Sequence, residues 1–180
     1  MDDIVMQAMV KWPNVPDCYG WLGLDGRGDW YLRDDAAQAC GDFASSVHYA
    51  RGSRLQHEKL IDFIQRNYAC DASGAWFFQN GPQRVYVELM HTPWVWRIHP
   101  EGHIVAHTGE VATVQESYLD ELGLLYLETP LGIGLIHTAD MAHAASKVEH
   151  GEWQPQEIQR SDMESRFGFV RSPQSVKGKA

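Results

Sequence analysis

Short apolar segments, separated by turns that end in glycine, recur along this chain. Four such turns occupy residues 25–28, 71–74, 99–102 and 120–123, and three of them begin with aspartate. Glycine at the last position can adopt the positive φ that a hairpin with a type I turn and a bulge requires. Aspartate at the first position can accept hydrogen bonds from the backbone that follows. The pattern therefore predicts four β-hairpin tips.

The segments on either side of these turns have the composition of β-strands. Apolar side chains alternate with polar ones, or aromatic and β-branched residues dominate. The clearest alternation, over residues 85–89, predicts a strand with one buried face. The expected strands are 19–24, 29–33, 75–78, 85–89, 94–98, 103–107, 115–119, 124–128 and 134–137.

Apolar residues at helical spacing predict three helices. They span residues 4–12, 53–68 and 138–150. Pro13 ends the first helix, and Gly151 ends the third at its C-cap. Ser53 and Gln56 form a capping box, in which both side chains bind free amides at the start of the second helix. Shorter helical turns are expected within residues 34–52 and 155–169.

The four hairpins also repeat in pairs, in the order A, B, A′, B′. The aligned pairs are Gly28 with Gly102, Leu24 with Ile98, Trp30 with Ile104, Gly74 with Gly123, Asp71 with Asp120, Trp76 with Leu125 and Tyr86 with Leu135. This alignment predicts two structurally related lobes. Hairpins at similar spacing in any antiparallel protein would give the same pattern, so this alternative stays open. The expected organisation is an N-terminal helix (1–14), a first lobe (15–91), a second lobe (92–151) and a C-terminal extension (152–180).

Several of these segments resemble a group of uncharacterised proteobacterial proteins that carry a domain of unknown function. The resemblance is carried by the runs at residues 20–31, 71–76, 81–88 and 92–94. It implies an α+β fold, in which antiparallel β-hairpin repeats form two packed half-barrel-like lobes with a central helix and a C-terminal helix. It implies at most a regulatory or signalling role, and it supplies no catalytic residue.

Composition narrows the functional classes further. The formal net charge of −9 opposes nucleic-acid binding, which requires basic side chains that displace counterions from phosphates. No apolar run approaches the ~20 residues of a membrane span, and the N-terminus lacks a signal-peptide pattern. We therefore expect a cytoplasmic protein with no membrane or nucleic-acid partner and with three mostly buried thiols. The last ten residues are expected to fray in solvent.

An aromatic and charged stretch is the first candidate for a binding site. Arg84, Glu88, Trp94 and Arg97 lie within a short span that also holds several aromatic residues. If neighbouring strands bring these side chains to one face, they could hold a planar anionic ligand or a partner peptide. The alternative is a core of large rings whose edges are covered by arginine stems.

Histidine is the second candidate. His99, His103 and His107 are spaced by four, and the first two flank a predicted hairpin tip. A metal site needs three or four ligands at ~2.0–2.2 Å from the ion. His103 and His107 on one strand would lie about 13 Å apart, which is too far to share an ion. We therefore expect no metal site and interpret these residues as exposed imidazoles, with metal binding kept as the alternative.

A third cluster could serve acid–base chemistry. Asp140 and His143 would share one face of the helix that follows His137, so a carboxylate could orient an imidazole. No serine, cysteine or threonine nearby lies in a nucleophile motif. Capping and dipole effects at the helix start explain the same residues.

These observations favour a non-catalytic module that binds a small molecule or a protein partner and uses no cofactor. A small hydrolase or isomerase that uses His137, Asp140 and His143 is the alternative. A purely structural role, including assembly as a homodimer, is the third hypothesis.

Overall fold

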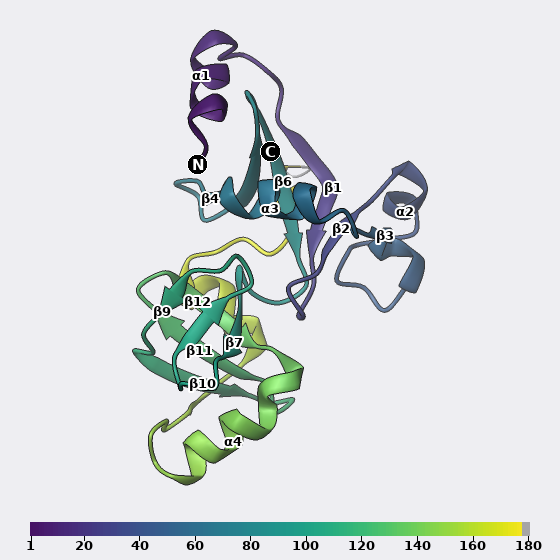
Figure 1. Cartoon of the computed structure of the whole chain (residues 1–180). Coiled ribbons are helices and arrows are strands. Elements are labelled where there is room, and N and C mark those ends of the chain that lie inside the picture. The colour runs from purple at the N-terminus through teal and green to yellow at the C-terminus, as the bar shows by residue number, and fades with distance from the viewer. Residues whose placement is uncertain (178–180) are drawn as a thin grey trace. The chain divides into compact units, whose positions relative to one another are not determined.

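The computed structural model describes residues 1–177 and divides into two compact units. Unit 1 contains residues 1–25, 29–90 and 169–177, and unit 2 contains residues 26–28 and 91–168. Each unit is built around its own sheet (Figure 1). The fold is therefore mixed α+β, as predicted, and over the described residues neither sheet closes into a barrel.

Unit 1 has a six-stranded sheet in the order β3-β2-β1-β6-β5-β4. Its strands are β1 (Cys18–Leu24), β2 (Trp30–Leu32), β3 (Ser53–Arg54), β4 (Tyr68–Cys70), β5 (Trp76–Asn80) and β6 (Gln83–Leu89). Its helices are α1 (Asp3–Lys11), α2 (Asp35–Ala39), the 3-10 helix η1 (His48–Arg51), α3 (Glu58–Arg66) and α6 (Pro173–Lys177). The central helix α3 packs against β5, where the Phe63 and Phe78 rings meet edge to face at 5.4 Å.

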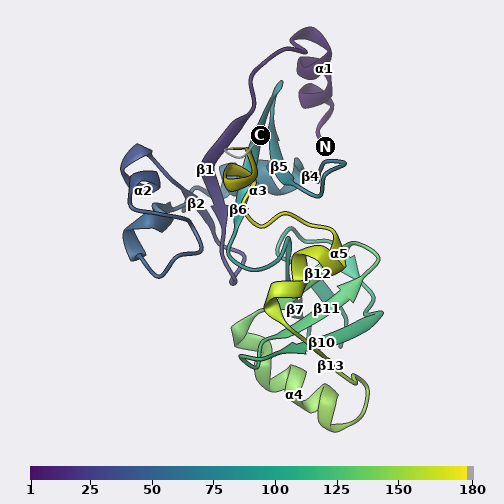
Figure 2. The same ribbon diagram turned by 180° about the vertical axis from the view of Figure 1, so that it is seen from behind.

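Unit 2 has a seven-stranded sheet in the order β13-β10-β11-β12-β7-β8-β9. Its strands are β7 (Trp94–Ile98), β8 (Ile104–Ala106), β9 (Val111–Ala112), β10 (Glu116–Asp120), β11 (Leu125–Thr129), β12 (Gly132–Ile136) and β13 (Gln156–Ile158). Its helices are the 3-10 helices η2 (Thr138–Asp140) and η3 (Arg160–Asp162), with α4 (Met141–Glu149) and α5 (Met163–Phe167). Figure 2 shows this unit from behind, with α4 and α5 labelled.

The two sheets share one topology, which confirms the predicted repeat. In both units three strands, β1-β2-β3 or β7-β8-β9, are followed by three more, β4-β5-β6 or β10-β11-β12, and the first strand pairs parallel with the last. The register agrees as well. Leu22 lies opposite Val87 in unit 1, and the aligned residue Trp96 lies opposite Ile136 in unit 2. Strand β13 extends the second sheet beyond β10.

The four predicted hairpin tips are all present. Gly28, Gly74, Gly102 and Gly123 have φ values of 80°, 85°, 89° and 76°, and each lies between two antiparallel strands. The aspartates act as expected. For example, Asp120 Oδ1 accepts hydrogen bonds from the amides of Leu122 and Leu124 at 3.0 and 2.7 Å. Local sequence therefore determines these turns.

The capping box at Ser53 was a wrong prediction. Ser53 and Arg54 form β3 and pair with β2, and this pairing holds the backbone in an extended conformation. The helix begins at Glu58 instead, where the His57 ring accepts a hydrogen bond from the Leu60 amide at 3.3 Å. Tyr68, expected at the end of the helix, begins β4.

Residues 169–177 return to unit 1 and cover β6, so the expected fraying is wrong for residues 171–177 (Figure 2). Val170 pairs with Ala75, and the Leu89 amide donates to the Arg171 carbonyl at 2.8 Å. Because this segment covers the second face of β6, the strand is buried on both faces over residues 86–89 rather than on one. Residues 178–180 of the predicted tail lie outside the described residues.

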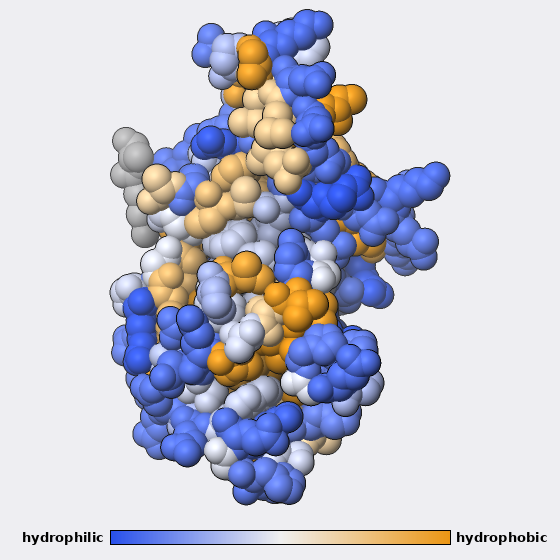
Figure 3. Space-filling view, turned by 60° about the vertical axis from the view of Figure 1, so that its left-hand side comes forward, coloured by the Kyte–Doolittle hydropathy of each residue, from blue (hydrophilic) through white to orange (hydrophobic). Residues whose placement is uncertain are grey.

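Two further expectations concern exposure. Cys40 and Cys70 are exposed free thiols, so only Cys18, which is half-buried, approaches the expectation of buried cysteines. Helix α1 keeps Val5 buried but exposes other apolar side chains, and Figure 3 shows hydrophobic residues on this part of the surface.

Among residues 1–177, no helix has both the length and the apolarity that crossing a bilayer would require.

Candidate functional site

Arg84 and Glu88, two of the four predicted ligand contacts, both lie on β6 of unit 1. The Arg84 guanidinium stacks over the Phe77 ring at 4.8 Å. Glu88 is only 3% exposed, and its carboxylate accepts hydrogen bonds from Ser172 Oγ at 2.6 Å and the Gln174 amide at 3.0 Å. Burial raises the pKa of Glu88. Glu88 therefore anchors the C-terminal segment.

The other two predicted contacts, Trp94 and Arg97, lie on β7 of unit 2. Trp94 is 7% exposed, and its indole N–H donates to the Leu131 carbonyl at 2.8 Å. Arg97 pairs with Asp140 through Nε–Oδ2 and Nη2–Oδ1 contacts of 2.6 and 3.2 Å. Neither unit gathers all four residues, and each of the four already has a structural partner.

The carboxylate of the predicted acid–base cluster, Asp140, takes part in the ion pair with Arg97. Asp140 Oδ2 also accepts from the Ile98 amide at 3.0 Å, and the hydrogen bonds from Arg97 lower the pKa of its carboxyl group. His137 accepts a hydrogen bond from the Ala139 amide at 3.0 Å, as a helix cap does. His143 lies on α4. Asp140 thus binds Arg97 and the Ile98 amide, and the charge interaction with His137 also lowers the pKa of its carboxyl group.

His143 instead lines a pocket of about 300 Å³ that lies wholly within unit 2. The pocket is formed by the end of β7, the β7–β8 tip, α4 and the turn after α4. Its polar lining consists of His99, His143, Ser146, Lys147, His150 and Glu152. Three of the nine histidines in the chain therefore line one pocket.

Hydrogen bonds fix several of these groups. Lys147 Nζ lies 2.6 Å from Glu152 Oε2. The His150 Nδ1 atom is 2.7 Å from the Ser146 carbonyl, which can only accept, so Nδ1 carries the proton. Sequence reasoning missed this pocket although a signal was present. Positions 143, 146, 147 and 150 follow the three- and four-residue spacing of one helix face.

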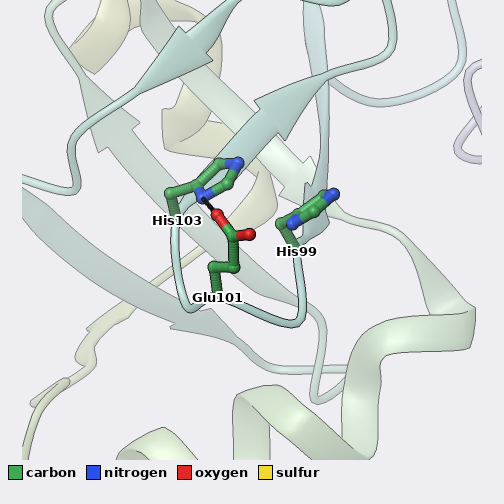
Figure 4. A group of neighbouring side chains, drawn as sticks. All are labelled: His99, Glu101 and His103. Atoms are coloured by element: carbon green, nitrogen blue, oxygen red, sulfur yellow. Dashed lines mark ion pairs between the residues drawn. The ribbon is translucent and has the colours of Figure 1, made fainter.

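Beside the pocket, the β7–β8 tip brings His99, Glu101 and His103 together (Figure 4). The two imidazole rings stack with centroids 4.5 Å apart. One ligand atom from each of the three side chains lies within 4.8 Å of the others. Glu101 Oε2 is 3.8 Å from His103 Nδ1. Sequence reasoning named both histidines of this group as candidate metal ligands.

His107, the third histidine of the predicted trio, does not belong to this group. Its Nδ1 atom accepts a hydrogen bond from the Val95 amide at 3.4 Å, and its ring packs 5.9 Å from Trp94. Burial of the ring lowers the pKa of His107 to about 3, which keeps it neutral. His107 therefore supports β7 and is separate from the tip cluster.

The fold and the pocket define an α+β protein of two repeated hairpin units. The family model DUF2944, described as "Protein of unknown function (DUF2946)", matches residues 1–174. The chain belongs to this family, which confirms the resemblance to uncharacterised proteins with a domain of unknown function.

Two solved structures are similar in part. A DUF1285 family protein from Silicibacter pomeroyi DSS-3 has a TM-score of 0.49 and 11% identity, over 74% of this chain and 72% of that chain. A DUF1285 family protein from Shewanella baltica OS155 has a TM-score of 0.45 and 14% identity, over 71% of this chain and 91% of that chain. No curated protein matches the chain.

Proposed function

We propose that this protein is a non-catalytic binding module whose ligand is a small anionic molecule held in the pocket of unit 2. The observation that carries the proposal is the convergence of His99, His143, His150 and Lys147 on one pocket. A volume of about 300 Å³ corresponds to the small end of ligand sites in proteins. The regulatory role implied by the resemblance would use this pocket as a sensor.

The polar groups of the pocket favour an anion over a cation. Imidazole and ammonium N–H groups donate hydrogen bonds, and Ser146 adds a hydroxyl. Glu152 is the pocket's one carboxylate among the described lining residues, and it is paired with Lys147. A carboxylate or phosphate group on a ligand could replace Glu152 as the partner of Lys147 and gain charge-assisted hydrogen bonds.

A thermal-shift screen against inorganic phosphate, citrate and adenosine monophosphate tests this proposal. A ligand present at 100 times its dissociation constant stabilises the folded state by about 2.7 kcal/mol, which gives a measurable increase in melting temperature. We expect His143→Gln and Lys147→Met to reduce that increase. His48→Gln and Lys59→Met, at exposed positions of unit 1, should leave it unchanged.

Two outcomes would contradict the proposal. One is a panel that leaves the melting temperature of the wild-type protein unchanged at millimolar concentrations. The other is a shift that persists in a variant carrying both His143→Gln and Lys147→Met, because such a shift would place the ligand elsewhere.

A further inference from the structure

We propose that the β7–β8 tip binds one divalent transition-metal ion through His99, Glu101 and His103. The tip adjoins the anion pocket and shares His99 with it, whereas Glu101 and His103 lie outside the pocket lining. The ion belongs to the class that prefers nitrogen and carboxylate ligands, of which Zn²⁺ is the example used below.

The hairpin itself brings the two histidines together. The His99 amide donates to the His103 carbonyl at 2.8 Å, and the Gly102 amide donates to the His99 carbonyl at 2.8 Å. Gly102, at φ 89°, allows the chain to reverse direction with only three residues between the histidines. Residues 99 and 103 thus close the turn, and their rings project side by side from it (Figure 4).

Glu101, at the apex of the tip, completes the group of three. Its carboxylate points back toward the rings, and its Oε2 atom lies 3.8 Å from His103 Nδ1 (Figure 4). The carboxylate is 78% exposed and the His103 side chain is 35% exposed, so both can change rotamer without disturbing the core. A negative charge beside two imidazoles favours a cation at this place.

The distances between the three candidate ligand atoms are compatible with binding of one metal ion after small shifts. Ligand atoms that bind Zn²⁺ at 2.0–2.2 Å in a tetrahedral arrangement lie about 3.4 Å from one another. The three candidate atoms are within 4.8 Å of each other, so closing around an ion requires shifts of about 1 Å. Exposed side chains at a hairpin tip can make such shifts by small rotations.

The chemistry of the donors selects the class of metal. Two neutral imidazole nitrogens and one carboxylate oxygen suit Zn²⁺, whereas Ca²⁺ and Mg²⁺ prefer sites built from oxygen ligands alone. Three protein ligands leave a fourth position for water or for a group from a bound molecule. The site is therefore of the open type rather than a closed structural zinc site.

Isothermal titration calorimetry with ZnCl₂ in a buffer free of phosphate and chelators, with a non-thiol reductant, tests the proposal. We expect one Zn²⁺ per chain, reversed by EDTA. Glu101→Gln and His103→Gln should each weaken binding at least tenfold, because each removes one of three ligands. NMR signals of the His99 and His103 rings should shift on titration, while those of His48 should not.

Matched variants separate this site from other zinc-binding groups. His48→Gln and His143→Gln remove imidazoles outside the tip and should leave the affinity unchanged. Replacement of the exposed Cys40 and Cys70 by serine should also have no effect. The proposal is overturned if Zn²⁺ binding is absent, if it survives in the Glu101→Gln and His103→Gln double variant, or if the cysteine or His143 variants abolish it.

Failure of this inference is distinguishable from failure of the proposed function. Glu101 and His103 are outside the lining of the pocket, so their substitution should leave the anion-induced increase in melting temperature unchanged. Conversely, Lys147→Met should reduce the response to anions and leave Zn²⁺ affinity unchanged. An anion response that disappears in the Glu101→Gln variant would contradict the separation of the two sites.

Discussion

At the scale of single residues, the two units use the same hydrogen bond to brace a hairpin tip. Tyr86 donates its hydroxyl to Asp71 Oδ2 at 2.8 Å in unit 1, and Tyr126 donates to Asp120 Oδ2 at 2.9 Å in unit 2. The two aspartates align in the repeat, but the two tyrosines do not. Tyr86 lies opposite Phe77 on the paired strand, and Tyr126 corresponds to Phe77. The tyrosine therefore comes from β6 in unit 1 and from β11 in unit 2, whereas the accepting aspartate occupies the same position in both units.

This bond should contribute measurably to stability. We predict that Tyr126→Phe lowers the free energy of unfolding by about 1–2 kcal/mol, because it leaves a buried carboxylate short of one donor. Urea denaturation at pH 7 measures the change. Tyr49→Phe, at a ring that is 78% exposed, is the control and should change stability by less than about 0.5 kcal/mol. Equal effects of the two substitutions would contradict a structural role for the Tyr126 hydroxyl.

At the scale of elements, the C-terminal segment 169–177 is attached to β6 through the buried carboxyl group of Glu88. Ser172 and the start of α6 donate hydrogen bonds to it, and Pro173 is buried. Sequence patterns did not predict this contact, because residues 171–177, with two serines, one lysine and a single valine, have no apolar period. Its attachment includes a buried acceptor 84 residues earlier in the chain from Ser172, together with backbone contacts of Val170 and Arg171.

Glu88 should make the stability of unit 1 depend on pH. Burial raises its pKa above the ordinary value of 4.5, so the folded state binds the proton more tightly than the unfolded state does. Its contribution to stability is complete below pH 4.5 and is lost as pH rises through the folded pKa. We predict that Glu88→Gln, which is neutral at every pH, keeps or raises the free energy of unfolding at pH 7.

The matching variant Glu88→Ala removes both hydrogen bonds and should lower the free energy of unfolding by about 1–3 kcal/mol. Urea denaturation of both variants at pH 4 and pH 7 measures these effects. The advantage of glutamine over glutamate should shrink at pH 4. A larger advantage at pH 4 than at pH 7 would contradict the assigned direction of the pKa shift.

At the scale of the whole molecule, the chain contains two units whose sheets share one topology. Unit 2 is continuous apart from residues 26–28, whereas unit 1 is assembled from both ends of the sequence. All seven strands of the second sheet lie between residues 94 and 158. A sheet and core complete within one continuous segment favour independent folding.

We therefore predict that a fragment spanning residues 91–168 folds by itself. A cooperative urea transition and dispersed amide signals in a two-dimensional NMR spectrum would show this. The fragment should retain Zn²⁺ binding at the tip, since all three proposed ligands lie within it. A fragment that stays unfolded while the full chain is cooperative would show that unit 2 depends on the rest of the chain.

Local sequence determined the hairpin tips and indicated that they repeat in pairs. Glycine at a required positive φ and aspartate at the start of a turn act on neighbouring backbone, so their effect is readable without the fold. The capping box at Ser53 failed for the opposite reason. Pairing with β2, a partner about twenty residues away, overrode the local preference for a helix.

Only the tertiary structure decided which side chains meet. His99 and His143 are 44 positions apart in the sequence, and they line one pocket because the β7–β8 turn lies beside α4 within unit 2. Arg84, Glu88, Trp94 and Arg97 are close in sequence but belong to two units, with two residues in each. Residues that are neighbours in the sequence determine how the backbone turns. Which side chains meet depends on packing between distant segments, and the local pattern does not contain that information.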